Sequence, residues 1–198
     1  MATMKDAKIL GGIGAILSLL SFIPHIGVVL GIIGLVLILI AVKYISDIVR
    51  DSQIFKNMII AIIAGIIGVA LSFLMFFTVF IGIILGRRAI PPRAGPLAII
   101  GGMIAVLIVL WIAFIVEGVF IRRCYNRIAE LTGVNVFKTT GLLYFIGAIL
   151  VIVLIGGIVL LVAKILEAVS FFSLPETYTP VQPKPPPPPP PPPPAQIS

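Results

Sequence analysis

The longest uncharged stretch of the chain, residues 9–42, restricts the fold more than any other feature. It contains 34 residues without Asp, Glu, Lys or Arg, and only Pro24 and His25 interrupt it near its middle. A single helix of this length would extend about 50 Å, whereas the hydrocarbon core of a bilayer is ~30 Å thick. The stretch is therefore either one long kinked helix or, as we predict, two membrane segments that reverse direction at Pro24-His25.

The composition excludes a soluble globular domain. Hydrophobic residues make up 60% of the chain and charged residues 11%, against ~25% charged residues in an ordinary soluble domain. The net charge is +7, but the basic residues lie in short segments between apolar ones, as expected of topology signals and contacts with lipid headgroups. We therefore expect the lipid bilayer to surround this chain, and we expect no nucleic-acid partner.

Five apolar segments predict an all-α, polytopic helical transmembrane bundle of about five spans, with four to six possible. The predicted spans are residues 9–23, 26–42, 58–85, 97–121 and 141–163. They form one membrane domain, residues 1–174. The intervening segments contain amphipathic stretches, residues 43–57 and 122–133, which predict short helices that either extend the spans or lie in the membrane interface. Residues 86–96 contain three prolines and two glycines and are predicted to form a loop.

The distribution of basic residues predicts the orientation. With five spans, nine Lys and Arg residues lie on the side of the N-terminus and five on the other side. Cytoplasmic loops of membrane proteins carry the excess of Lys and Arg. We therefore expect a multi-pass protein of the cell membrane with a cytoplasmic N-terminus.

A sixth segment remains an alternative. The last apolar stretch contains Gly156-Gly157 near its middle, and a reversal there would return the C-terminus to the cytoplasm. The sequence favours a single span because these glycines have no polar neighbour to stabilise a turn. Lys164 and Glu167, three residues apart, fit the interfacial end of a helix.

Residues 175–198 differ in composition from the rest of the chain. They include ten consecutive prolines, Pro185 to Pro194, which in a polyproline II helix extend about 31 Å at ~3.1 Å per residue. We predict a disordered tail that serves as a spacer or binds a partner with an aromatic-lined groove. Glycines four residues apart, such as Gly27 and Gly31 or Gly82 and Gly86, predict close helix packing within the chain or in a homo-oligomer.

Few residues can support chemistry. His25 is the only histidine and Cys124 the only cysteine, so we predict no metal site, no cofactor and no catalytic residues. The ionisable residues near membrane depth are His25, Glu117, Lys164 and Glu167. All four are placed at segment ends by the predicted spans, whereas an ion relay usually has an acid in the middle of a span. These four are candidate site residues only if a polar path runs through the membrane domain.

Several short motifs occur in an order that resembles a family of uncharacterised, largely archaeal, integral membrane proteins known only as a domain of unknown function. The motifs are residues 10–17, 22–24, 54–57, 132–134, 137–143 and 171–175. The resemblance implies a polytopic membrane domain. It implies no activity, so no site residue can be transferred.

These observations lead to two functional hypotheses. The first is a structural or assembly component of the membrane that binds other membrane proteins and is not an enzyme. The alternative is a small-solute or ion transporter, or a subunit of a channel.

Overall fold

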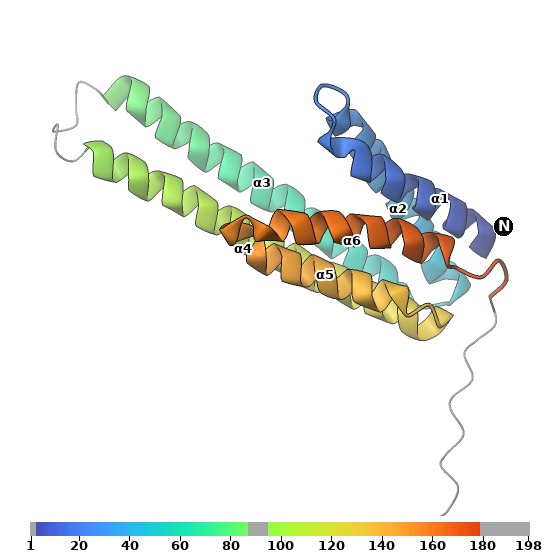
Figure 1. Cartoon of the computed structure of the whole chain (residues 1–198). Helices are drawn as coiled ribbons and strands as arrows, with labels where there is room; N and C mark the ends of the chain where they lie inside the picture. Colours follow the sequence, from blue (N-terminus) through green and yellow to red (C-terminus); the bar gives the residue numbers. More distant parts are fainter. Residues whose placement is uncertain (1–2, 87–94, 179–198) are drawn as a thin grey trace, which may run out of the picture.

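The computed structural model describes residues 3–86 and 95–178, whose regular elements are all helical (Figure 1). The elements are α1 (Met4–Leu19), η1 (Leu20–Phe22), α2 (Gly27–Ile48), α3 (Ser52–Gly86), α4 (Gly95–Thr132), α5 (Val136–Leu150), η2 (Val151–Val153) and α6 (Ile155–Phe172). The all-α prediction is confirmed. The predicted loop at residues 87–94 and residues 179–198 of the proline-rich tail lie outside the described residues.

The helices form three antiparallel hairpins, α1–α2, α3–α4 and α5–α6, which pack against one another along part of their length (Figure 1). Helices α3 and α4 have 35 and 38 residues, which correspond to about 52 and 57 Å. The other two hairpins are shorter and cover only one half of α3–α4. The bundle therefore has a closed end, where α1 and α3 begin and α2, α4 and α6 end, and an open end, where α3 and α4 project alone (Figure 1).

Within the described part of the chain, five helices are long and apolar enough to cross a membrane: α2, α3, α4, α5 with η2, and α6. Large apolar side chains cover the outer surface of these helices, and Phe73 of α3 and Leu97 of α4 are exposed by 68% and 72%. Contiguous apolar surface of this kind is rare on soluble monomers. The protein is a multi-pass membrane protein.

The reversal predicted at Pro24-His25 is confirmed. Helix α1 continues through η1, and the chain then turns over residues 23–26 into α2. The N–H of Gly27 donates a 2.8 Å hydrogen bond to the carbonyl of Ile23, while His25 adopts a φ of 73°. A Cβ atom on Gly27 would lie 2.1 Å from the carbonyl oxygen of Ser21. The turn therefore requires glycine at this position.

The predicted single span 141–163 is wrong. Helices α5 and α6 are separate and antiparallel, and the chain reverses over residues 151–154, where Leu154 has a φ of 63°. The turn needs no polar side chain because backbone amides satisfy it: Leu154 N–H donates to Val151 O and Gly157 N–H to Leu154 O. Gly156 packs on the backbone of Gly147 and Val151. The end of α6 consequently lies at the closed end, beside the start of α1 (Figure 1).

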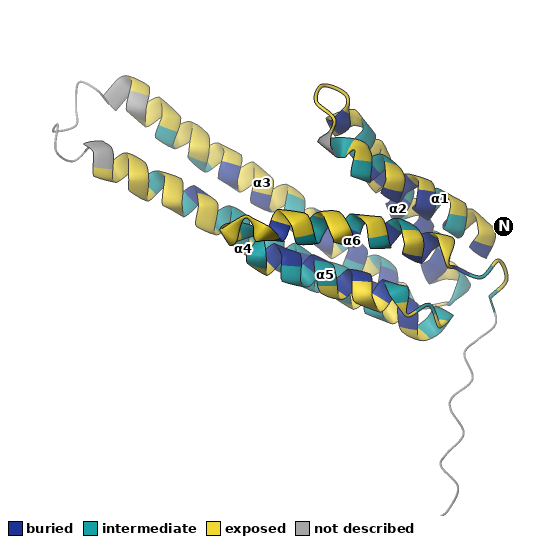
Figure 2. Ribbon diagram, viewed as in Figure 1, coloured by how far each residue is buried: buried dark blue, intermediate teal, exposed yellow. Residues whose placement is uncertain are grey.

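The amphipathic segments are extensions of the spans rather than separate interfacial helices. Helix α2 continues without a break to Ile48, α3 begins at Ser52, and α4 continues to Thr132. Buried residues gather at the closed end of the bundle (Figure 2). Their centre is an aromatic cluster in which the ring of Phe137 lies 5.5 Å from that of Tyr125 and 5.2 Å from that of Phe171. The Phe171 ring also covers Gly11 of α1, so it joins the first hairpin to the third.

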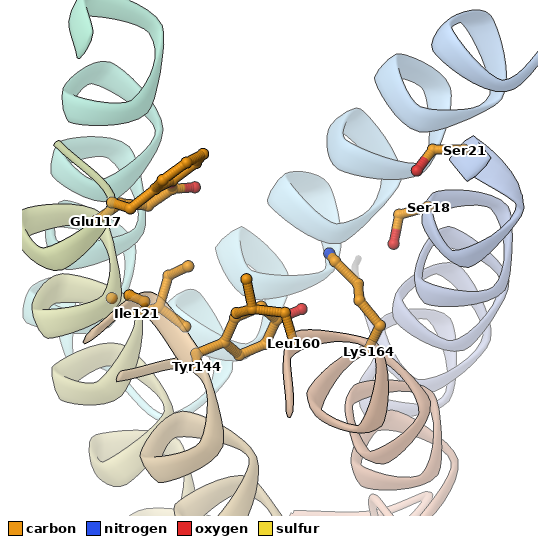
Figure 3. A pocket seen from close by; sticks show the side chains of 10 residues that line it. Ser18, Ser21, Glu117, Ile121, Tyr144, Leu160 and Lys164 are labelled. Carbon is orange, nitrogen blue, oxygen red and sulfur yellow. The ribbon is translucent and has the colours of Figure 1, made fainter. Parts of the chain in front are cut away.

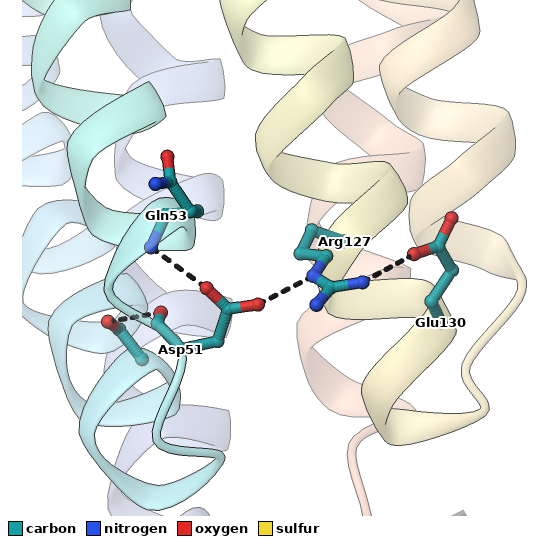
Figure 4. A network of polar contacts seen from close by, with 5 residues as sticks. Asp51, Gln53, Arg127 and Glu130 are labelled. Carbon is teal, nitrogen blue, oxygen red and sulfur yellow. Dashed lines mark hydrogen bonds and ion pairs between the residues drawn. The ribbon is translucent and has the colours of Figure 1, made fainter.

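An ion-pair network fixes the turn between α2 and α3 to α4 (Figure 4). Arg127 donates from Nε to Asp51 at 2.5 Å and also contacts Glu130 at 3.2 Å. The second carboxylate oxygen of Asp51 accepts the N–H of Gln53 at the start of α3. Partial burial opposes ionisation of Asp51, but the hydrogen bonds from Arg127 and Gln53 outweigh it and hold its pKa below the ordinary value. The network therefore favours the ionised form of Asp51 at the closed end.

Small residues set the distance between neighbouring helices. A Cβ atom on Gly34 of α2 would lie 2.5 Å from the carbonyl oxygen of Gly14 and 2.6 Å from the amide nitrogen of Ser18, so α1 and α2 touch through their backbones. Gly31 packs on the Ser21 side chain, whereas a Cβ on Gly82 would meet nothing within 4 Å. Within the described chain, close packing therefore uses Gly14, Gly31 and Gly34 but not Gly82.

We expect Gly34→Ala to destabilise the protein by about 1–3 kcal/mol, because the new methyl group collides with backbone atoms of α1 that cannot rotate away. The measurement is unfolding of the purified protein in detergent. Gly82→Ala is the matched control, and it should be neutral or stabilising by up to about 1 kcal/mol, since alanine favours the helix and nothing opposes it. Equal stabilities of the two variants would contradict backbone contact between α1 and α2.

Candidate functional site

A buried carboxylate, Glu167 of α6, lies between three helices. Only 3% of Glu167 is exposed. Its side chain accepts hydrogen bonds from the hydroxyl of Tyr125 on α4 and, at 2.7 Å, from the hydroxyl of Tyr144 on α5. The ammonium group of Lys164, one turn earlier in α6, donates to it at 3.0 Å. The carboxylate thus has three donors, one of which carries the opposite charge, as a buried carboxylate requires.

The prediction that Lys164 and Glu167 share one helical face is confirmed. The prediction that they lie at the end of a helix is wrong. They are the tenth and thirteenth residues of the 18-residue α6, so both lie within the helix. Tyr125 and Tyr144 were not predicted as partners. Tyr125 belongs to the apolar face of the amphipathic segment 122–133, which indicated burial, but no local pattern indicated that its hydroxyl meets α6.

A second carboxylate, Glu117 of α4, is half-buried and lies apart from this group. It is the twenty-third of the 38 residues of α4, so the prediction that it marks a segment end is also wrong. Among the described residues Glu117 has no hydrogen-bond or salt-bridge partner. It lines a cavity of about 200 Å³ together with Lys164, Tyr144, Ser18 and Ser21. Figure 3 shows Glu117 on one side of this cavity and Lys164 with the two serines on the other.

Glu117 also lines a second, larger groove of about 700 Å³. Apart from Glu117, the groove is lined by apolar residues of α2, α3 and α4, among them Leu35, Ile62, Val69 and Phe73. A Cβ atom on Gly65 of α3 would lie 3.1 Å from a carboxylate oxygen of Glu117. The absence of a side chain at Gly65 therefore makes room for the carboxylate between the two cavities.

The structure brings together three of the four candidate residues. Glu117, Lys164 and Glu167 surround or adjoin one cavity, whereas His25 is exposed at the tip of the α1–α2 hairpin. Within the described chain no three His, Cys, Asp or Glu residues form a group that could hold a metal ion. Two carboxylates face one ammonium group, so the cluster has a net charge of −1 when all three are ionised. Its chemistry suits the binding of a cation rather than of an anion.

We expect Lys164 and Glu167 to be energetically coupled. Lys164→Met and Glu167→Gln each leave the other charged group in a poorly solvated place without its partner, whereas the double variant removes both charges. The effects of the two substitutions on the free energy of unfolding should therefore be non-additive by about 1–3 kcal/mol. Unfolding of the four proteins in detergent measures this coupling.

The pair Lys43 and Asp47 is the matched control. Their side chains are 46% and 55% exposed and form an ion pair of 2.6 Å, so Lys43→Met and Asp47→Asn should couple by no more than about 0.5 kcal/mol. Equal coupling in the two pairs would mean that Glu167 is not held in a poorly solvated site.

Comparison with known proteins gives no function for these residues. Residues 30–165 match the model of a family described as "Protein of unknown function (DUF996)", and this range includes Glu117, Tyr125, Tyr144 and Lys164. An uncharacterized protein of Methanocaldococcus jannaschii is 41% identical over 173 residues, which cover 87% of this chain and 94% of that protein. No solved structure matches the chain.

Proposed function

We propose that this chain, which belongs to the DUF996 family of proteins of unknown function, is a transporter or a channel subunit. In this role it binds a small cationic solute inside the bilayer. Membership of an uncharacterised family with an archaeal relative confirms the resemblance drawn from the sequence motifs. The proposal takes up the second hypothesis of the sequence analysis. It rests on the chain's own residues.

The carboxylate of Glu117 is the observation that carries this proposal. It lies within a long helix, beside two cavities, and without a partner among the described residues. A charged side chain inside a membrane is costly, and such residues usually face a cavity and mark the path of an ion or a substrate. The nearby ammonium of Lys164 is already paired with Glu167, which leaves Glu117 free to pair with a cation that enters the cavity.

A partner-binding or assembly role is the second candidate. The open ends of α3 and α4 support it, because the other two hairpins do not cover them and their apolar side chains are exposed (Figure 2). Another membrane protein could pack on this surface. The proline-rich tail would supply a second contact with such a partner, and it lies largely outside the described residues. The expectation that the protein is not an enzyme stays a prediction.

We expect proteoliposomes that contain only this protein to take up labelled tetramethylammonium, driven by a membrane potential that is negative inside. Glu117→Gln should reduce uptake to the rate of protein-free vesicles, because it removes the negative charge that attracts the cation. Glu130→Gln is the control on the same helix, since its side chain is 63% exposed, and it should leave uptake unchanged. Vesicles without flux, together with specific co-purification of another membrane protein, would instead favour the assembly role.

We propose that the protein lies in the cell membrane with its closed end on the cytoplasmic side. Nine basic residues lie toward this end, whereas the segment that joins the open ends of α3 and α4 contains three. Those at the closed end are Lys5, Lys8, Lys43, Arg50, Lys56, Arg122, Arg123, Arg127 and Lys138. Because every hairpin returns to the closed end, the N-terminus and the end of α6 share one side. The positive-inside rule assigns this side to the cytoplasm.

Cysteine labelling of intact cells tests this orientation. In a Cys124→Ser background, Ala94→Cys should react with a membrane-impermeant maleimide from outside. Ala195→Cys should react only after the cells are permeabilised, since the chain leaves α6 at the closed end. Reaction of Ala195→Cys in intact cells would show that the closed end, or the tail that follows it, faces outward.

A further inference from the structure

The two cavities meet at shared lining residues but differ in chemistry. Both are lined by Glu117 and Phe114. The smaller one adds the hydroxyls of Ser18, Ser21 and Tyr144 and the ammonium of Lys164. Among the described residues that line the larger one, Glu117 alone is charged. A molecule that fills both would therefore have a polar head and an apolar body.

Charge complementarity determines the sign of the head. Lys164 and Glu167 neutralise one another at 3.0 Å, so Glu117 gives the site its excess negative charge. An anionic head would be repelled by two carboxylates, and a neutral head would supply no counter-charge to the ionised form of Glu117. A single positive charge satisfies it. Phe114 and Phe73 also line the groove, and the face of an aromatic ring attracts a cation.

The apolar groove leads from Glu117 to the surface that lipids cover. Leu35 of α2 lies on one wall, and Ile66, Val69 and Phe73 of α3 lie on another. The tip of the α1–α2 hairpin diverges from α3 (Figure 1), and Ile66 and Val69 are more than half exposed. The volume of about 700 Å³ falls within the range of ~300–1,000 Å³ that is usual for ligand pockets. A ligand dissolved in the bilayer can enter from the side.

We infer that the ligand of this site is an amphiphilic monocation, with an ammonium-type head against Glu117 and an apolar chain in the groove between α2 and α3. This inference rests on the proposed function, because it names the class of cation that the same site takes. The apolar groove contributes affinity that a small cation such as tetramethylammonium does not obtain, since burial of each methylene group in an apolar groove favours binding.

The test is binding of radiolabelled dodecyltrimethylammonium to the full-length protein in lipid nanodiscs, below the concentration at which the probe forms micelles. Empty nanodiscs of the same composition give the background of lipid partitioning. We expect saturable binding of one probe molecule per chain. Dodecyl sulfate and dodecyl maltoside have the same chain with an anionic and a neutral head, and they should not compete.

Two pairs of variants separate the head from the chain. Glu117→Gln should weaken binding of dodecyltrimethylammonium by about tenfold or more, because it removes the Coulomb attraction between the carboxylate and the cationic head, while Glu130→Gln should not change it. Val69→Phe narrows the groove, so it should weaken the binding of dodecyltrimethylammonium by a larger factor than it changes the uptake of tetramethylammonium. Ile84→Phe is its control, on an exposed part of α3 outside the groove. The unfolding temperature of each variant checks that it remains folded.

The outcomes distinguish the inference from the proposed function. If tetramethylammonium uptake depends on Glu117 but the long-chain cation binds no better than dodecyl sulfate, the amphiphile inference is wrong and the proposed function holds. If neither cation responds to Glu117→Gln, both are wrong. Binding of all three dodecyl probes at equal strength would mean that the groove holds ordinary lipid chains.

Discussion

The hydrogen-bonded carboxylate of Glu167 is the interaction on which the arrangement of the hairpins depends. Its donors come from α4, α5 and α6, so one side chain joins the central hairpin to the third. Removal of any donor would leave a charge with fewer partners in a poorly solvated place, which is more costly than the loss of an apolar contact. Phe171, one turn further along α6, packs on Gly11 and connects the first hairpin to the same region.

The position of this group explains why the bundle is closed at one end and open at the other. Tyr125, Phe137 and Phe171 pack with Glu167 near the closed end, and the ion pair between Asp51 and Arg127 fixes the α2–α3 turn there. Toward the open end, α1–α2 separates from α3, and α3 and α4 contact one another through small residues such as Gly68 and Ala113. Cavities form where tight packing ends, and Glu117 lies at that boundary.

The proposed function follows from the difference between the two carboxylates. Glu167 is surrounded by donors, so a ligand has little to gain by approaching it. Glu117 is in the opposite situation, since its neighbours leave space, no described residue forms a hydrogen bond or ion pair with it, and Lys164 in the same cavity is paired with Glu167. Two acidic residues of similar sequence context therefore have different roles, one structural and one suited to binding. Only their surroundings distinguish them, as burial and neighbouring charges determine which form of a carboxyl group is stable.

The sequence by itself determined that this is a helical membrane protein, that the chain reverses at Pro24-His25, and that amphipathic segments adjoin the apolar ones. These are local properties, because the length of an apolar segment, a proline and a helical period act over a few residues. The tertiary structure alone decided the second reversal at residues 151–154 and the partners of Glu167. That reversal depends on contacts of Gly156 with Gly147 and Val151, and the carboxylate depends on hydroxyls 42 and 23 residues away. Neither leaves a pattern within one segment, since both are contacts between helices that only the folded bundle brings together.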